Sequence, residues 1–252
     1  MIEAWLPADL SMAAAALLVL SSFFTSLMTA AFGIGGGLTL LGIMTFLMPV
    51  AAIIPVHGAV QFGSNAGRTF IQRRHIAMPE LGAFAFGGLF GAAIGASVVV
   101  ELPEPVLLLA LGLFVLAATW IKLPVMRTMS LKGFAITGAV TTFLTMFVGA
   151  TGPLNLAAFE KSFPDRKRMV ATLAALMTAQ HALKLAAFGT AGFVFGPWIP
   201  LIAAMMITGY AGTLSGSRIL HRTSEGTFRG GMRFIMTIIA LDMLRRGVTP
   251  LL

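Results

Sequence analysis

Residues 10–67 read LSMAAAALLVLSSFFTSLMTAAFGIGGGLTLLGIMTFLMPVAAIIPVHGAVQFGSNAG, without a single Asp, Glu, Lys or Arg. Two further uncharged stretches lie between Lys132 and Glu160 and between Lys184 and Arg218. Each is longer than the roughly 20 apolar residues that a helix needs to cross a bilayer. The sequence therefore predicts an all-α polytopic membrane protein.

The composition excludes several classes of protein. Of the 252 residues 58% are hydrophobic and 10% charged, against about 25% charged in soluble domains. The absence of cysteine excludes disulfides and thiolate chemistry. The 17 Lys and Arg residues lie mostly in short loops, which follows the positive-inside rule and does not indicate a nucleic-acid partner. Membrane lipid is the expected surrounding, and acidic Glu3 and Asp9 argue against a cleaved signal peptide.

Apolar segments succeed one another along the whole chain, so we expect a single transmembrane transporter domain over residues 1–252. The segments are 10–32, 38–54, 55–72, 79–100, 105–122, 131–150, 153–160, 168–191, 197–219 and 229–246.

Two glycine-rich tracts interrupt these segments inside uncharged sequence. Gly33–Gly37 separates the first segment from the second, and Gly149–Pro153 separates the sixth from the seventh. One constant offset aligns Gly33 with Gly149 and Arg68 with Lys184. This pattern predicts two homologous repeats, at about 10–124 and 130–247, with their junction near residue 128.

The loop charges predict that the two repeats are inverted. Basic residues at 73–74 and 122–132 are expected on the cytoplasmic side, and the acidic 101–104 loop on the outer side. Each repeat then consists of a broken or re-entrant hairpin at its glycine tract followed by three transmembrane helices. The basic pair at 245–246 is the exception to this arrangement.

Broken helices inside a membrane survive where they line a cavity or pack against protein. In a cavity the free N–H groups at Gly35–Gly37 and Thr151–Pro153 would favour an anion. The alternative is close helix packing through small residues, which we expect for the pairs Gly91/Gly95 and Gly212/Gly216. The candidate substrate-binding residues of the two breaks are Gly35, Gly36, Gly37, Thr151 and Gly152.

A polar face follows each break. The spacing i, i+3, i+4, i+7 of Gln61, Ser64, Asn65 and Arg68 puts these four on one side of a helix, and a corresponding set occurs in the second repeat. Two cations together with amides and hydroxyls suit an oxyanion; alternatively, the cations snorkel to an interface. The candidates are His57, Gln61, Ser64, Asn65 and Arg68 in the first set, and Thr178, Gln180, His181 and Lys184 in the second.

Other kinds of chemistry find little support in the residues. His57 and His181 could carry protons, because imidazole titrates near neutral pH, or could hydrogen-bond a neighbour. Ser215 has no well-placed base, and no His, Asp and Glu cluster suggests a metal. We therefore expect no enzyme activity, no cofactor and no metal. Asp242 is expected to pair with Arg245 or Arg246.

The chain resembles the TauE/SafE sulfite exporter family, also called the toluene sulfonate uptake permease family, over nearly its whole length. The resemblance implies a multi-pass transporter of the bacterial inner membrane, which moves sulfite, sulfonates, sulfoacetate or related organic anions. Members commonly carry Thr-Ser pairs where this sequence has Gln61 and Ser64-Asn65. The segments that carry the likeness are Phe32–Gly37, Pro55–Arg68, Ile71–Ile76, Gly149–Pro153, Val170–Thr172 and Met177–Lys184.

The sequence thus predicts a secondary transporter of a small anion that works by alternating access, with a central site between the two broken hairpins. Export would follow an inside-negative potential, whereas uptake would need a coupling proton or sodium ion. Two alternatives stay open: an anion channel, and a non-transporting membrane scaffold or assembly factor.

Overall fold

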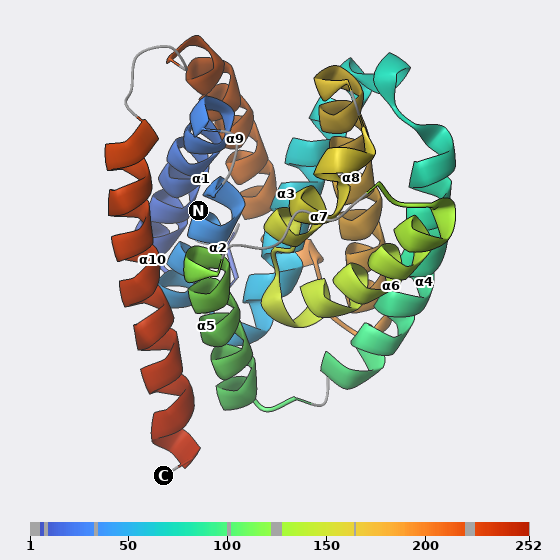
Figure 1. Cartoon of the computed structure of the whole chain (residues 1–252). Helices are drawn as coiled ribbons and strands as arrows, with labels where there is room; N and C mark the ends of the chain where they lie inside the picture. Colours follow the sequence, from blue (N-terminus) through green and yellow to red (C-terminus); the bar gives the residue numbers. More distant parts are fainter. Residues whose placement is uncertain are drawn as a thin grey trace. The chain divides into compact units, whose positions relative to one another are not determined.

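The computed structural model describes residues 6–7, 10–32, 35–99, 102–121, 128–163, 165–219 and 225–251, and within these ranges the chain forms helices and turns but no strand. The prediction of an all-α protein is therefore confirmed (Figure 1). The α-helices are α1 (Met12–Phe32), α2 (Gly36–Leu47), α3 (Val50–Ile71), α4 (Met78–Val99), α5 (Glu104–Trp120), α6 (Leu131–Val148), α7 (Gly152–Phe159), α8 (Arg166–Thr190), α9 (Ile199–Ile219) and α10 (Glu225–Val248).

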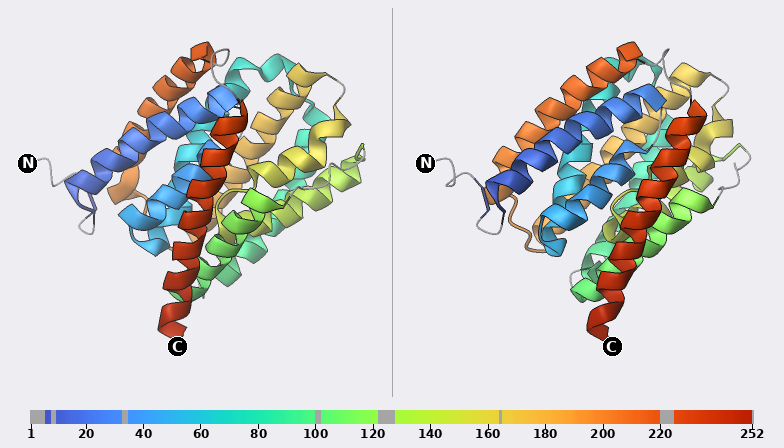
Figure 2. Two further views of the ribbon diagram at one scale, coloured as in Figure 1. Left: turned by 60° about the vertical axis from the view of Figure 1, so that its left-hand side comes forward. Right: turned by 90° about the vertical axis from the view of Figure 1, so that its left-hand side faces the viewer.

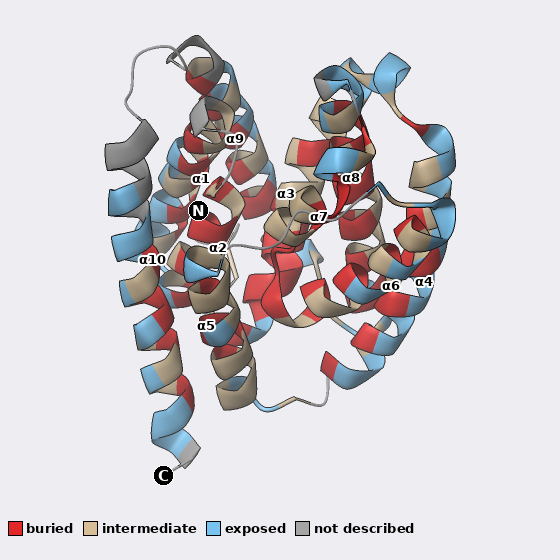
Figure 3. Cartoon of the chain, viewed as in Figure 1, coloured by how far each residue is buried: buried red, intermediate tan, exposed pale blue. Residues whose placement is uncertain are grey.

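Five helical stretches of the described chain are long and apolar enough to cross a membrane, and they lie in α1, α4, α6, α8 and in α9 with the turn before it. Many large apolar residues of these helices are exposed, such as Phe86 and Ile94 on α4. Figure 3 colours the exposed parts of the helices pale blue. Exposed apolar residues of this kind fit contact with lipid. The chain is a multi-pass membrane protein.

The boundary between the second and third helices differs from the prediction. We expected segments 38–54 and 55–72, but α2 ends at Leu47 and α3 runs through Pro55. Met48 is extended, with φ −146° and ψ 161°, because a residue before proline disfavours the helical region. Pro55 lies in the second turn of α3, where its missing N–H removes a single helical bond. Gly33, Ile34 and the junction at 122–127 lie outside the described residues.

The helices pack into two compact units that we call unit 1 and unit 2. Unit 1 contains α1, α2, α5, α9, α10 and α3 up to Val60. Unit 2 contains α3 from Gln61, together with α4, α6, α7 and α8. Each unit thus combines helices from both halves of the sequence.

Pairs of helices from distant parts of the sequence form the frame of each unit. In unit 1, α1 packs along α9 and α5 along α10, as both views in Figure 2 show; in unit 2, α4 packs along α6. A Cβ at Gly212 would overlap the carbonyl of Phe23, and one at Gly91 would overlap the carbonyl of Ala139. The expected packing role of these GxxxG glycines is confirmed, because only glycine allows so close an approach.

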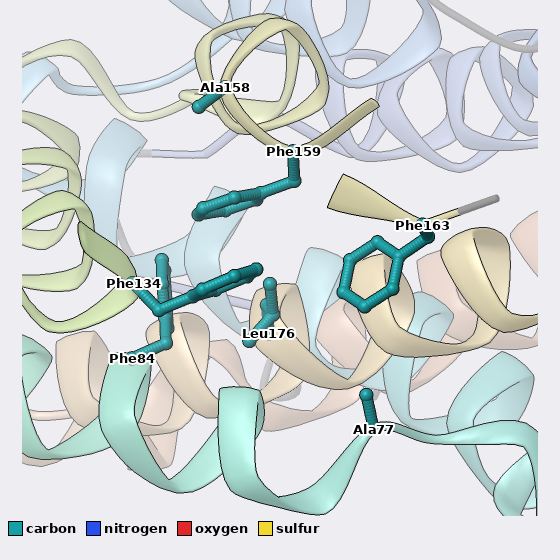
Figure 4. Packing of buried hydrophobic residues seen from close by; sticks show 7 residues of the cluster. All are labelled: Ala77, Phe84, Phe134, Ala158, Phe159, Phe163 and Leu176. Atoms are coloured by element: carbon teal, nitrogen blue, oxygen red, sulfur yellow. The ribbon is translucent and has the colours of Figure 1, made fainter. Parts of the chain in front are cut away.

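An aromatic cluster holds the short helix α7 in place inside unit 2. The rings of Phe134 and Phe159 stack with their centroids 4.5 Å apart, and Phe84 meets Phe159 edge-on at 5.9 Å. Leu176 of α8 completes this contact (Figure 4). The end of α7 is thereby anchored between α4, α6 and α8, while its beginning contacts α8 through polar groups.

Candidate functional site

The break between α6 and α7 lies inside unit 2. Gly149 follows the last residue of α6 and has φ 71°, a conformation that favours glycine. Its N–H still bonds to the carbonyl of Thr145 (3.1 Å), whereas its own carbonyl leaves the helix axis and accepts the hydroxyl of Thr145 (3.1 Å). The break therefore presents a backbone carbonyl to a neighbouring helix.

Lys184 of α8 binds this carbonyl. Its Nζ donates to Gly149 O at 2.9 Å and to Thr145 Oγ1 at 3.4 Å, and the side chain is fully buried. Among the described residues no carboxylate oxygen lies within 4.0 Å of Nζ. An ionised amine inside a membrane protein needs a compensating charge. Neutral oxygens are the only partners that the described chain supplies here.

A network of amides and hydroxyls lies one turn earlier on α8. Gln180 Oε1 accepts Thr151 Oγ1 (2.9 Å) and Asn155 Nδ2 (3.3 Å), both at the start of α7. Gln180 Nε2 donates to the hydroxyls of Thr141 (3.1 Å) and Thr142 (3.4 Å) on α6. Gln180 thus joins the three helices around the break, and all five side chains are buried.

The first turn of α7 leaves backbone donors without a side-chain cap. Thr151 occupies the N-cap position but gives its hydroxyl to Gln180. We expected donors from Thr151 through Pro153, yet proline has no N–H, so Gly152 and Leu154 supply the donors of this turn. A Cβ at Gly152 would meet no atom within 4 Å. The first turn of α7 therefore combines open space at Gly152 with the positive electrostatic potential of a helix N-terminus.

The corresponding break in unit 1 precedes α2. Gly35 has φ 100° and is the N-cap of α2. A Cβ at Gly36 would overlap the carbonyl of Thr25 on α1, so the lack of a side chain there has a packing reason. His57 of α3 is buried and its Nε2 donates to Gly37 O at 2.9 Å. At this break, an imidazole side chain therefore donates to the backbone of the second helix.

The remaining predicted residues lie on the second half of α3 and on α8. Asn65 Nδ2 donates to Gln61 O (2.8 Å), and Arg68 Nη2 donates to Asn65 Oδ1 (2.9 Å). Arg68 and Ser64 are half-buried. Within the described part of the chain, no hydrogen bond joins any of these side chains to Lys184.

Two further predicted residues lie on α8 itself. His181 is buried there. The hydroxyl oxygens of Thr178 and Thr69 of α3 lie 2.9 Å apart. Their hydrogen bond links α8 to the part of α3 that belongs to unit 2.

The structure thus groups the predicted residues into three sets. Thr151, Gln180 and Lys184 gather at the α6–α7 break, His57 joins Gly37 in unit 1, and Asn65 joins Arg68. Four further residues at the α6–α7 break were missed by sequence reasoning, although polar residues inside an uncharged span were a usable signal. They are Thr141, Thr142, Thr145 and Asn155.

Broken helices that end at buried polar side chains, within a multi-pass chain, are typical of membrane transporters. The chain belongs to the sulfite exporter TauE/SafE family, which it matches over residues 18–243. Comparison with curated proteins and with solved structures gave no match. The predicted resemblance is confirmed, and the family is one of membrane transporters, not of enzymes.

Proposed function

We propose that the chain is a secondary transporter that moves a small sulfur-containing or related organic anion, of the sulfite, sulfonate or sulfoacetate class, across the bacterial inner membrane by alternating access. The observation that carries this proposal is Lys184, a fully buried amine with no carboxylate partner among the described residues.

An anion bound at the α6–α7 break would supply the negative charge that the buried ammonium group of Lys184 needs as a partner. In the described state Nζ binds Gly149 O and Thr145 Oγ1, and oxyanion oxygens are better acceptors than either because they carry charge. A sulfonate has several acceptor oxygens and therefore needs several donors. The N–H groups of Gly152 and Leu154 are the nearby donors that no side chain caps.

The membrane potential sets the direction of uncoupled transport. An inside-negative potential favours outward movement of an anion by about 2.3 kcal/mol per charge per 100 mV. Export therefore requires no coupling ion, whereas uptake requires a coupled proton or sodium ion.

Ligand-dependent thermal stability of the purified protein tests the site. A bound ligand stabilises the folded state by an amount that rises with the logarithm of its concentration relative to Kd, so sulfite, thiosulfate, sulfoacetate, taurine, sulfate and chloride are compared at equal concentration. We expect a selective shift in the wild type that disappears in Lys184→Met, which keeps the side-chain volume. Lys132→Met is the matched control, because Lys132 is an exposed lysine at the start of α6. A shift that persists in Lys184→Met would remove Lys184 from the site.

Counterflow in proteoliposomes separates a carrier from a channel. Labelled anion entering vesicles should be accelerated by unlabelled anion on the opposite side, and the rate should saturate. Flux that is linear in concentration and insensitive to the opposite side contradicts the carrier mechanism.

A further inference from the structure

Thr141 determines which atoms donate and which accept in the hydrogen-bond network around Gln180. Its hydroxyl proton is donated to Thr137 O at 2.8 Å, so its oxygen can only accept the bond from the Gln180 amide. Gln180 must then present Nε2 to α6 and Oε1 to α7. The orientation of this amide follows from its partners.

The same reasoning continues to Asn155 on α7. Gln180 Oε1 is an acceptor, so Asn155 must turn its Nδ2 toward it, as the 3.3 Å contact shows. Nδ2 also lies 3.8 Å from the sulfur of Met177. If the Asn155 amide were flipped, two carbonyl oxygens would face each other. Its Oδ1 is therefore directed away from the network.

Asn155 Oδ1 takes no part in the hydrogen bonds of this network. Asn155 is fully buried, and within the described chain its Oδ1 has no hydrogen-bond partner. A buried acceptor without a donor destabilises the protein. Such an atom in a candidate binding site indicates a ligand group that donates.

We infer that the transported anion carries a hydroxyl group, which donates a hydrogen bond to Asn155 Oδ1. The inference rests on the proposed function and names the chemistry of its substrate. Gln180 and Lys184 are four residues apart on α8, or about 6 Å along the axis. Lys184, which binds Gly149 O in the structure, would bind the anionic end, and Asn155, which contacts Gln180, would accept the hydroxyl at the other end. A short hydroxyalkyl sulfonate has both ends.

Two probes of equal charge and nearly equal shape test this inference. Hydroxyethanesulfonate and propanesulfonate differ only by a hydroxyl in place of a methyl group. We expect the purified wild-type protein to bind hydroxyethanesulfonate about ten-fold more tightly, because only this probe satisfies the buried acceptor. In Asn155→Ala the two affinities should agree within about two-fold, while propanesulfonate still binds.

A control for the loss of a buried polar group is Ser22→Ala, because Ser22 is buried in unit 1 and its hydroxyl donates to Met205 O at 2.6 Å. Ser22→Ala should keep the wild-type ratio of the two affinities. Equal affinities in the wild type, or a preference that survives in Asn155→Ala, overturn the inference and leave the proposed function standing. If Asn155→Ala does not fold, the wild-type ratio alone decides. Failure of the wild type to bind any anion overturns both.

Discussion

The break before α2 in unit 1 and the break before α7 in unit 2 each contain a glycine with positive φ, at the N-cap of α2 and at the C-cap of α6. Gly35 and Gly149 both have positive φ, and the carbonyl of each accepts a threonine hydroxyl, from Thr39 and Thr145 respectively. The helix that closes each break differs: α3 offers an imidazole to Gly37, whereas α8 offers the amine of Lys184.

The buried side chains around the two breaks also differ in polarity. The buried side chains that α2 and the start of α3 contribute to unit 1 are mostly apolar, such as Leu41, Met44 and Ile53. Around Lys184 the buried side chains include threonines and amides as well as apolar residues such as Met177. A broken helix needs only hydrogen-bond partners for its backbone. A cation with an oriented polar network exceeds that need, and the difference points to anion binding in unit 2.

Replacing the closing residue of each break should give the largest difference between them. Lys184→Met removes a buried charge that would pair with the anion, so we expect anion affinity to fall by about 100-fold or more. His57→Leu should change affinity less than about five-fold but lower the stability by about 1–3 kcal/mol, because Gly37 O loses a donor. Titration calorimetry with the most stabilising anion measures the first effect, and thermal unfolding measures the second.

Equal losses of affinity in Lys184→Met and His57→Leu would contradict this asymmetry. They would show that both breaks contribute to one binding event, and the imidazole at the break of unit 1 would then need a functional explanation as well.

An added methyl group should distinguish the glycines of the two breaks. In Gly36→Ala the new Cβ overlaps the Thr25 carbonyl, so we expect a loss of about 3 kcal/mol or failure to fold. Gly152→Ala meets no atom within 4 Å and should change stability by less than about 1 kcal/mol. Thermal unfolding and size-exclusion profiles of the two variants provide the measurement. A Gly152→Ala protein as unstable as Gly36→Ala would disprove the open space at α7.

The sequence predicted the helices and both breaks because hydropathy and glycine tracts act locally. The role of the Gly36 N–H in anion binding stays a prediction, and the sequence could not show that Gly36 also packs on Thr25 of another helix. The i, i+4 spacing of Gln180 and Lys184 predicted a shared face, but it could not identify Thr141 or Asn155 as partners. Such contacts depend on how helices pack, and the many glycines of this chain allow several close pairings.

The helix pairs show the same limit. Helix α1 packs along α9, and α4 along α6, with close backbone contacts at glycines such as Gly91 and Gly212, where a Cβ would overlap the neighbouring helix. Their spacing predicts close packing without naming the partner helix. The Asp242–Arg245 pair, at 2.7 Å, was predictable because both residues lie on one helix, and Arg246 instead donates to Thr45 O.

Arg68 sharpens the comparison between the two cations that the sequence offset aligns. Arg68 is half-buried and donates to Asn65 Oδ1, so a neighbouring amide already stabilises part of its charge. We expect Arg68→Gln to reduce anion affinity by less than about ten-fold, well below the effect of Lys184→Met. The same calorimetric titration measures it. A loss equal to that of Lys184→Met would place Arg68 in direct contact with the anion.

The smallest expected effects come from the threonines that bind the two glycine carbonyls. Thr39→Val and Thr145→Val each remove the hydroxyl that donates to a glycine carbonyl and should lower stability by about 1 kcal/mol, because Gly35 O keeps the Thr39 N–H and Gly149 O keeps Lys184. Their effects on binding should differ. Thr145 Oγ1 accepts from Lys184 Nζ in the described state, so its removal leaves the amine less satisfied and should raise anion affinity by about two- to five-fold. Thr39→Val should leave the affinity unchanged. A fall in affinity in Thr145→Val would have the opposite meaning, since the hydroxyl must then donate to the bound anion.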